Sequence, residues 1–465
     1  MFSKIKKYSL FLQQAIKGTQ EDLTKISIKR AIILLSVPMV LEMVMESLFA
    51  VVDVFFVSRI STNAVATVGL TESVITIVYA LGIGLSMAAT AMISRRIGEK
   101  KPQEASYTAM QAIILTFLIS IVLGVVGFIY GEDILALMGG EADLIAEGRW
   151  YTKIMYGGSG VIMLLFLVNG IFRGAGNAAL AMRALWISNI LNMLLDPLLI
   201  FGWGPIPAMG IAGAAVATTI GRSVGVIYQM YHLLKGSGII NIYWRHIAPN
   251  FNMMLRITKI AAGGVGQFLI ESASWIFLTR VISNFGSEAL AGYTIAMRII
   301  IFTILPSFGI SNAAATLVGQ NLGAKLPDRA EKSVWLAAKY NVIFLSSAGV
   351  IFYIFTNEIV GLFTDKTMVK MEAIKAIRFI CFGYIFFAYG MVVSHAFNGA
   401  GDTKTPTIIN FVCFWIIQIP MAYYLSFELA LGSDGVYIAI IASFSLLAIL
   451  AIIWFKKGKW KLKEV

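Results

Sequence analysis

The sequence predicts an all-α membrane protein with twelve transmembrane helices arranged in two six-helix lobes. The composition gives the first reason. Of the 465 residues, 58% are hydrophobic and 13% are charged, whereas soluble domains are about 25% charged. An internal repeat gives the second reason, because the chain aligns with itself at a constant offset of 225 residues. Two copies of one membrane unit are typical of secondary transporters.

Twelve apolar runs justify the helices in order. Each is about 20 residues or longer, enough to cross a hydrocarbon layer of about 30 Å. Helices are favoured over a barrel, whose strands are about 10 residues of alternating polarity. The runs lie near 31–58, 65–93, 106–130, 150–171, 179–201, 210–234, 255–282, 290–318, 333–356, 374–397, 406–426 and 434–455.

The predicted organisation has five segments. They are an N-terminal segment 1–30, a first lobe 31–234, a linker 235–254, a second lobe 255–455 and a basic tail 456–465. The first segment mixes basic and apolar residues, so it is either an amphipathic helix on the inner leaflet or a disordered tail.

The distribution of basic residues predicts the orientation in the membrane. Of the 37 Lys and Arg residues, 27 fall at the termini or in even-numbered loops, Arg95 and Arg173 among them. By the positive-inside rule both termini are cytoplasmic, and we expect a bacterial inner-membrane protein. The net charge of +12 is therefore a topology signal with a weak contribution from lipid headgroups. No soluble basic face for nucleic acid is present.

The repeat aligns glycines of the two copies. Gly98 lines up with Gly323, Gly174 with Gly399, and Gly210 with Gly435, and the alignment needs no insertion. Because each copy has six helices, both copies have the same orientation in the membrane. The lobes are therefore parallel repeats related by an axis along the membrane normal.

The two copies differ most in their buried acids. Asp53 faces Leu278, Glu72 faces Met297, Asn192 faces Ile417, and Asp196 faces Met421. Glu46 and Glu271 are the one acidic pair left on both sides. The first copy thus has polar groups where the second has hydrocarbon, which places the ion chemistry in the first lobe.

Helical periodicity groups the polar residues of the first lobe. Spacings of three, four and seven put them on shared helix faces. The groups are Glu42, Glu46 and Asp53; Asn189, Asn192 and Asp196; and Thr218 with Arg222. Asp53, Glu72, Asp196 and Thr218 lie at comparable depths, roughly 7 to 12 Å below the outer ends of their helices at about 1.5 Å per residue.

Buried acids at one depth require a partner. A charged residue in mid-membrane costs at least about 2.5 kcal/mol, so these acids pair, take up protons or bind a cation. Ligands that are all oxygen suit a hard cation such as Na⁺, and carboxyl groups serve a proton equally well. The sequence therefore predicts Na⁺ or H⁺ as the coupling ion and no other cofactor.

Several other classes of function are excluded. No phosphate-binding loop, nucleotide fingerprint or nucleophile elbow is present, so neither an enzyme nor an ATP-driven pump on this chain is expected. Cys381 and Cys413 lie in apolar runs and are expected to be reduced packing residues. The three histidines have no ligand spacing.

Four strings make the resemblance to a family specific. VVDVFFVSRIS, NGIFRGAGN, NILNMLLDPLLIFG and GIAGAAVAT resemble the multidrug and toxic compound extrusion (MATE) family, over about residues 28–456. The resemblance implies a V of two lobes and cation-coupled drug export by alternating access. It also implies a first-lobe ion site at Asp53, Asn192, Asp196 and Thr218, with Thr219 as an adjacent alternative to Thr218.

In the second lobe the resemblance is partial. Glu271 matches a seventh-helix glutamate of some members, but the tenth helix here lacks the acid that accompanies it. A second-lobe site built from two acids is therefore not expected, and the DinF-like branch fits best. Further candidates for coupling or the substrate cavity are Glu42, Glu46, Glu72, Asn189, Gln267, Glu271 and Arg298; for Arg222 and Arg298 a structural counter-charge is favoured.

The predicted function is a monomeric antiporter that exports organic, cationic drugs. The main alternative is a lipid-linked saccharide flippase of related architecture, which would need a cationic cavity. Acids outnumber Arg and Lys inside the first lobe, which disfavours it. A uniporter or channel would transport without a Na⁺ or pH gradient.

Overall fold

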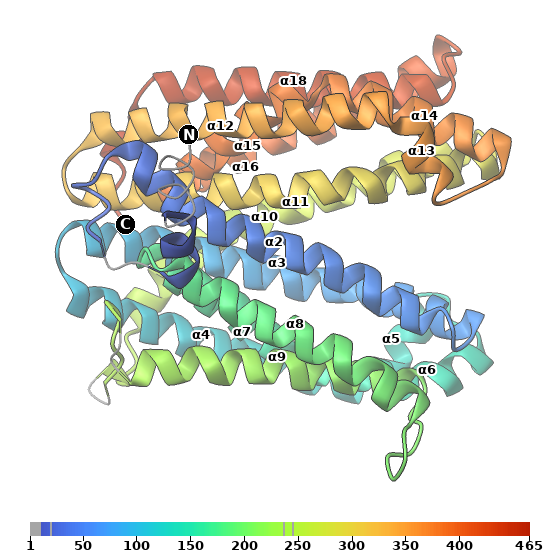
Figure 1. Ribbon diagram of the computed structural model, residues 1–465, viewed down its shortest axis with the longest axis horizontal. Coiled ribbons are helices and arrows are strands. Elements are labelled where there is room, and N and C mark those ends of the chain that lie inside the picture. Colours follow the sequence, from blue (N-terminus) through green and yellow to red (C-terminus); the bar gives the residue numbers. More distant parts are fainter. Residues whose placement is uncertain (1–10, 19–20, 236–237, 244–245) are drawn as a thin grey trace, which may run out of the picture.

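The computed structural model describes residues 11–18, 21–235, 238–243 and 246–465. Within these ranges the chain is helical almost throughout, and its only β pairing is an isolated bridge between Trp203 and Ile206. Long helices run side by side along the long axis of the molecule (Figure 1). The predictions for residues 1–10 and for 236–237 and 244–245 of the linker lie outside the described residues.

The first lobe contains eight helices. They are α2 (Ile28–Val57), α3 (Thr62–Gly98), α4 (Pro102–Ile129), α5 (Gly131–Leu137), α6 (Ala142–Gly157), α7 (Ser159–Gly174), α8 (Ala178–Phe201) and α9 (Ile211–Leu234).

The second lobe repeats this order. It contains α10 (Phe251–Ser283), α11 (Ser287–Gly323), α12 (Pro327–Ile354), α13 (Thr356–Gly361), α14 (Thr367–Phe382), α15 (Tyr384–Gly399), α16 (Lys404–Asn410), η2 (Phe411–Gln418), α17 (Ile419–Tyr423), η3 (Tyr424–Glu428) and α18 (Ser433–Lys456), followed by η4 (Lys459–Leu462).

These helices make twelve crossings. Ten described spans are long and apolar enough to cross a membrane, with α6 and α7 counted as one and α16 to η3 as another. The pair α14 and α15, bent by 57°, makes an eleventh. Helix α2 has 30 residues, about 45 Å at 1.5 Å per residue, and makes the twelfth. The predicted fold of two six-helix lobes is confirmed.

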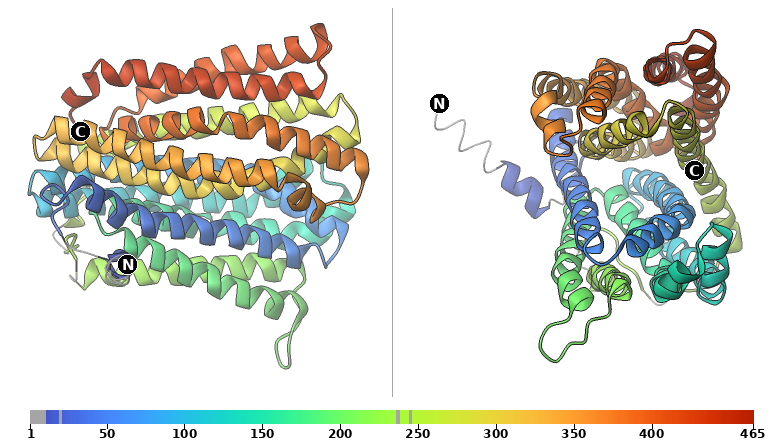
Figure 2. Two further views of the ribbon diagram at one scale, coloured as in Figure 1. Left: turned by 45° about the horizontal axis from the view of Figure 1, so that its top comes forward. Right: turned by 90° about the vertical axis from the view of Figure 1, so that its right-hand side faces the viewer.

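Both chain ends lie at one end of the molecule. The described N-terminal residues, the C-terminus and the turns from α3 to α4 and from α11 to α12 gather there (Figures 1 and 2). We call this the terminal end and the opposite one the far end. Each lobe has its own apolar core, but the first half of α2, with Ile32, Leu35 and Met39, belongs to the core of the second lobe.

The lobes meet through glycines near the terminal end. A Cβ on Gly98 of α3 would lie 2.0 Å from the carbonyl oxygen of Gln320 in α11, and one on Gly323 would lie 2.1 Å from that of Arg95. Only glycine permits helices to approach this closely. In the far half of α3, a Cβ on Gly69 would meet nothing within 4 Å. The two lobes therefore pack directly against each other at the terminal end, and we call this arrangement the locked state.

The repeat does not keep one offset, contrary to the ungapped alignment. Helices α3 to α7 recur as α11 to α15 at an offset of 225 residues, except that α13 ends one residue early. At the next pair of helices the far loop is shorter in the second copy. Gly210 caps α9 with φ 56° and ψ −139°, and its structural counterpart is Gly432, which caps α18 with φ 59° and ψ −138°. Gly435, the partner predicted from sequence, lies inside α18.

The offset also changes along the preceding helix. Gly210 N–H donates to Ile200 O, and Gly432 N–H donates to Ser426 O, so the offset there is 226. The π-helical turns η2 and η3 interrupt this helix of the second copy, and a π turn accommodates one extra residue. Asn192 therefore corresponds to Gln418 and Asp196 to Ala422. The sequence predicted apolar counterparts for both Asn192 and Asp196. For Asn192 this prediction is wrong, because Gln418 is polar and its amide donates to Ser443 Oγ at 2.8 Å.

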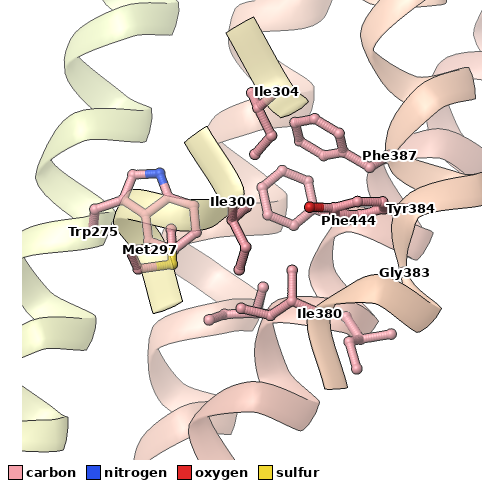
Figure 3. A pocket seen from close by; sticks show the side chains of 11 residues that line it. Trp275, Met297, Ile300, Ile304, Ile380, Gly383, Tyr384, Phe387 and Phe444 are labelled. Atoms are coloured by element: carbon pink, nitrogen blue, oxygen red, sulfur yellow. The ribbon is translucent and has the colours of Figure 1, made fainter. Parts of the chain in front are cut away.

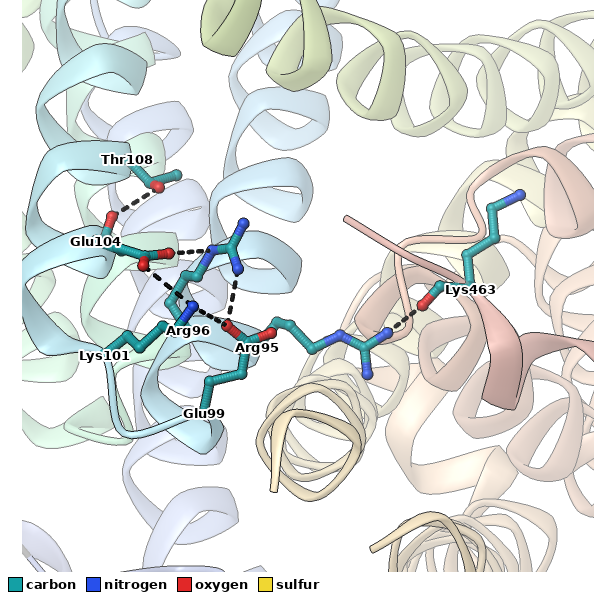
Figure 4. A network of polar contacts seen from close by, with 7 residues as sticks. All are labelled: Arg95, Arg96, Glu99, Lys101, Glu104, Thr108 and Lys463. Atoms are coloured by element: carbon teal, nitrogen blue, oxygen red, sulfur yellow. Dashed lines mark hydrogen bonds and ion pairs between the residues drawn. The ribbon is translucent and has the colours of Figure 1, made fainter. Parts of the chain in front are cut away.

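Two chain segments tie the lobes together at the terminal end. The guanidinium of Arg95 in α3 donates to the carbonyl oxygen of Lys463 in the C-terminal tail (Figure 4). Asp22, which lies near the N-terminus, accepts a hydrogen bond from Lys100 of the first lobe at 2.6 Å. Arg329 of the second lobe donates to the carbonyl oxygen of Leu23 at 3.0 Å. The N-terminal strap, residues 21–27, thus contacts both lobes.

The linker between the lobes is attached to α4. Gln111, which is fully buried, donates to the carbonyl oxygens of His246 at 3.0 Å and Ala248 at 2.9 Å. Its own side-chain oxygen accepts from the N–H of Asn250 at 2.8 Å. The described part of the linker therefore follows the first lobe up to the start of α10.

Candidate functional site

Three polar side chains meet in the far half of the first lobe, between α8 and α9. Asn192 Nδ2 donates to Thr218 Oγ1 at 3.0 Å and to Asp196 Oδ1 at 3.4 Å. All three side chains are buried, Asp196 completely. The helices approach closely because Gly221 faces Ser188, where a Cβ would lie 2.7 Å from the carbonyl oxygen.

Asp53 joins this group from α2. It is half-buried, and its carboxylate interacts electrostatically with Asp196 and with Glu72 of α3. No hydrogen bond connects it to a described residue. The four residues that the resemblance implied as an ion site, Asp53, Asn192, Asp196 and Thr218, therefore lie in one cluster, which we call the aspartate site.

The aspartate site has unused oxygen atoms. Asn192 Oδ1 and Asp196 Oδ2 are buried and have no hydrogen-bond partner. Orphaned buried acceptors cost about 1–3 kcal/mol each, and more when charged. A cation bound between them, or a proton on the carboxylate, would remove that cost. The donor set of carboxylate, amide and hydroxyl oxygens fits a hard cation.

One helical turn deeper, Glu46 has a full set of partners. Arg222 Nη2 lies 3.2 Å from Glu46 Oε1, and Asn189 Nδ2 donates to Glu46 Oε2 at 2.9 Å. The guanidinium carbon of Arg222 also lies 5.3 Å from the ring centre of Phe49, within cation–π range. Glu46 is therefore held by partners rather than open to an incoming ion.

Deeper still, Glu42 forms a buried network that the sequence analysis missed. Asn169 Nδ2 donates to Glu42 Oε1 at 3.0 Å, and Arg173 Nη1 lies 3.6 Å from the same oxygen. Arg173 also donates to Ser86 Oγ at 3.0 Å. The prediction that Arg173 belongs to a charged loop is wrong, since it is 8% exposed. Its spacing of four from Asn169 was the available signal.

The second lobe makes the same contact without charge. Gln267 and Asn398 stand 225 residues after Glu42 and Arg173. Each of their amides donates to the other at 3.0 Å. The repeat has thus preserved the geometry between these two helices while replacing an ion pair with an amide pair.

Of the remaining candidates, one is associated with the aspartate site and two are not. Glu72 and Arg298 are exposed, and Glu271 is half-buried. The side-chain charges of Arg298 and Glu271 have no hydrogen bond or ion pair with the described residues. Glu72 interacts electrostatically with Asp53. Of these three, only Glu72 thus extends the aspartate site.

An apolar pocket occupies the corresponding place in the second lobe (Figure 3). Its wall includes the aromatic side chains Trp275, Tyr384, Phe387 and Phe444, together with Met297, Ile300, Ile304, Ile380 and Ile440. By the structural repeat, Met297, Ile440 and Phe444 stand where the first lobe has Glu72, Thr218 and Arg222. These three positions are polar in the first lobe and apolar in the second.

The described residues contain no cluster of three or more His, Cys, Asp or Glu side chains placed to hold a metal ion. Cys381, which is half-buried, and Cys413, which is buried, are free thiols.

Comparison with known proteins adds three findings. A family model described as MatE matches residues 38–198 and again 265–424, once in each lobe. A probable multidrug resistance protein NorM of Thermotoga maritima is 26% identical over 459 residues, covering 99% of this chain and 98% of that protein. A protein of Shewanella oneidensis described as an FAD transporter is 25% identical and covers 88% of this chain and 89% of its own length.

Solved structures agree with these matches. A crystal structure described as MATE in complex with MaL6 has a TM-score of 0.89 at 26% identity, covering 95% of this chain and 99% of that chain. A structure described as the outward-facing conformation of a multidrug resistance MATE family transporter also has a TM-score of 0.89 at 26% identity, covering 95% and 98%.

Proposed function

The chain belongs to the MATE family of efflux transporters, and from this premise we propose that it is a cation-coupled antiporter that exports organic cations. It is an integral membrane protein and not an enzyme. The observation that carries the proposal is the aspartate site, where the buried oxygen atoms Asn192 Oδ1 and Asp196 Oδ2 have no hydrogen-bond partner. Such groups persist inside a membrane protein where they bind an ion or a proton.

The position of the site fits uptake of the ion from the far side. The aspartate site lies in the far half of the first lobe, and the lobes are locked together at the terminal end. We place the terminal end in the cytoplasm of a bacterium, in line with the distribution of Lys and Arg. An ion from outside would reach Asp53, which is half-buried, before Asp196, which is fully buried.

The ion supplies the driving force. A potential of 100 mV provides about 2.3 kcal/mol for each net charge moved inward. Exchange of one monovalent ion for one monovalent organic cation moves no net charge, so the concentration gradient of the ion drives it, and a tenfold ion gradient provides about 1.4 kcal/mol. Na⁺ or H⁺ would neutralise Asp53 and Asp196, and this change in charge biases the first lobe toward the arrangement that releases the exported compound.

The charge of the first lobe favours cationic substrates. Its interior contains more acids than bases, with Glu42, Glu46, Asp53, Glu72 and Asp196 against Arg173 and Arg222. A flippase for a phosphate-bearing lipid would need the opposite charge. The protein acts as a monomer, because two lobes of one chain enclose the pathway.

The proposal is tested in proteoliposomes loaded with a fluorescent organic cation. Efflux is measured under a Na⁺ gradient alone and then under a pH gradient alone, for the wild type and for Asp196→Asn. We expect one gradient to drive efflux by the wild type and neither to drive efflux by the variant. Equal efflux with no gradient would instead indicate a uniporter or channel. If a gradient drives efflux by Asp196→Asn as fast as by the wild type, the coupling ion does not bind at this site.

A further inference from the structure

Arg222 is a buried cation with unused donors. It is 2% exposed, and only Nη2 has a partner, Glu46 Oε1 at 3.2 Å. Its Nε and Nη1 atoms are buried without any hydrogen-bond partner. A guanidinium has five N–H donors and no acceptor, so most of the bonding capacity of this group is unused. Glu46 alone therefore does not account for the place of Arg222.

The missing acceptors lie one helical turn away. Arg222 follows Thr218 by four residues on α9, so both face the same direction. Thr218 belongs to the aspartate site, where Asp196 Oδ2 and Asn192 Oδ1 have no donor. Arg222 also interacts electrostatically with Asp53. Unsatisfied donors and unsatisfied acceptors thus occupy neighbouring layers of one buried cluster.

Glu46 would keep one hydrogen-bond partner if the guanidinium turned away. Its second oxygen accepts from Asn189 Nδ2 at 2.9 Å, and it is less buried than Asp196, at 20% side-chain exposure. The movement that would bring Arg222 to the aspartates is a rotation of its own side chain along α9.

We propose that Arg222 is a tethered cation that competes with the coupling ion for the aspartate site. When the ion is bound, the guanidinium stays with Glu46 and Phe49. When the ion leaves, the guanidinium turns toward Asp53 and Asp196 and prevents the empty site from holding two unpaired acids. The inference rests on the proposed function and adds to it the group that makes ion release favourable.

The second lobe supports this pairing of an Arg with the acids. The structural counterpart of Arg222 is Phe444, and the counterpart of Asp196 is Ala422. Both lie in apolar surroundings. If Arg222 served only to join α9 to α2, its presence would not depend on the acids. The second lobe lacks both the arginine and the acids.

The test measures cation binding by the purified full-length protein. The variants are Arg222→Gln, which removes the charge, and Arg222→Lys, which keeps it. Arg256→Gln is the matched control, because Arg256 is an exposed arginine of α10 outside the site. Binding of ²²Na⁺ is measured at fixed pH, and protonation of buried carboxyl groups is followed by infrared spectroscopy in Na⁺-free buffer.

Removal of a competing positive charge should tighten binding. We expect Arg222→Gln to raise the affinity for Na⁺ at least about tenfold, or to raise the midpoint of carboxyl protonation by at least about one pH unit. Arg222→Lys should remain near the wild type, and so should Arg256→Gln. Affinity of Arg222→Gln equal to or weaker than that of the wild type would overturn the inference.

Asp196→Asn separates this inference from the proposed function. If Asp196→Asn loses cation binding while Arg222→Gln binds as the wild type does, the site is correct and only the role of Arg222 is wrong. If Asp196→Asn binds the cation as the wild type does, the aspartate site itself is wrong. Arg222→Lys keeps the test informative if Arg222→Gln does not fold, because a tethered competitor predicts wild-type affinity for the variant that keeps the charge.

Discussion

Gly98→Ala should disfavour the state in which the lobes are locked at the terminal end. The added Cβ would lie 2.0 Å from Gln320 O, 2.8 Å from Gln320 C and 3.0 Å from Ala324 N. All three are backbone atoms of α11 and of Ala324, the residue that caps its C-terminus, so no side chain is able to move aside. The two helices would have to separate by about 1 Å, and overpacking of this kind costs about 1–3 kcal/mol.

The cost applies to one conformation only. Alanine is about 1 kcal/mol better than glycine inside a helix, but this gain is equal in both conformations because α3 remains a helix. The equilibrium should therefore shift away from the locked state by about 1–3 kcal/mol, or roughly 5- to 150-fold. Driven efflux should fall, because export requires both conformations.

The shift is measured as a distance distribution between spin labels. One label replaces Lys101 in the first lobe and the other replaces Lys332 in the second, after Cys381 and Cys413 have been substituted. Gly69→Ala is the control, because it lies in the same helix and its Cβ would meet nothing within 4 Å. A distribution for Gly98→Ala that is identical to that of Gly69→Ala would refute the reasoning.

Two further predictions concern single contacts. Arg173→Met should destabilise the protein by about 3–5 kcal/mol, because it leaves Glu42, at 1% exposure, without its counter-charge. The double variant Glu42→Gln/Arg173→Asn, which copies the amide pair of the second lobe, should recover most of the loss in thermal unfolding; no recovery would contradict the equivalence of the two pairs. In the N-terminal strap, burial raises the pKa of Asp22, but hydrogen bonds from Lys100 and Thr24 outweigh it and lower the pKa from 3.8 to about 2. The strap contact is therefore complete above about pH 4 and is lost only as the pH falls toward 2. Limited proteolysis at the strap should be unchanged between pH 8 and pH 5 and faster throughout in Asp22→Asn; cleavage that rises between pH 8 and pH 5 in the wild type would show that Asp22 titrates higher.

The sequence predicted the twelve crossings because long apolar runs depend on local composition alone. It also predicted the repeat, which is visible in glycines such as Gly98 and Gly323. The change of offset near Gly432 was not predictable in the same way. A π turn inserts one residue without interrupting the hydrophobic run. The shorter far loop then changes the offset from 226 at Ile200 and Ser426 to 222 at Gly210 and Gly432, while both helices stay apolar, so an ungapped alignment still looks complete.

The grouping of Asn192, Asp196 and Thr218 followed from helix spacing and depth. The structure brings these side chains within hydrogen-bonding distance, although whether they bind the ion stays a prediction. The pairing of Glu42 with Arg173 did not follow, because it joins α2 to the end of α7, and helix spacing carries no information about which helices are neighbours. The unused donors of Arg222 also depend on tertiary packing and became visible only in three dimensions.

The central claim is that coupling resides in the first lobe, and a comparison of Asp196→Asn with Glu271→Gln tests it most directly. Each variant removes one acid, from the first and second lobe respectively, and ion flux is measured together with drug efflux in the same proteoliposomes. The account predicts that Asp196→Asn loses ion flux and gradient-driven efflux. Glu271→Gln should keep the wild-type ratio of ions moved to drug exported. Loss of the coupled ion in Glu271→Gln with normal coupling in Asp196→Asn would contradict it.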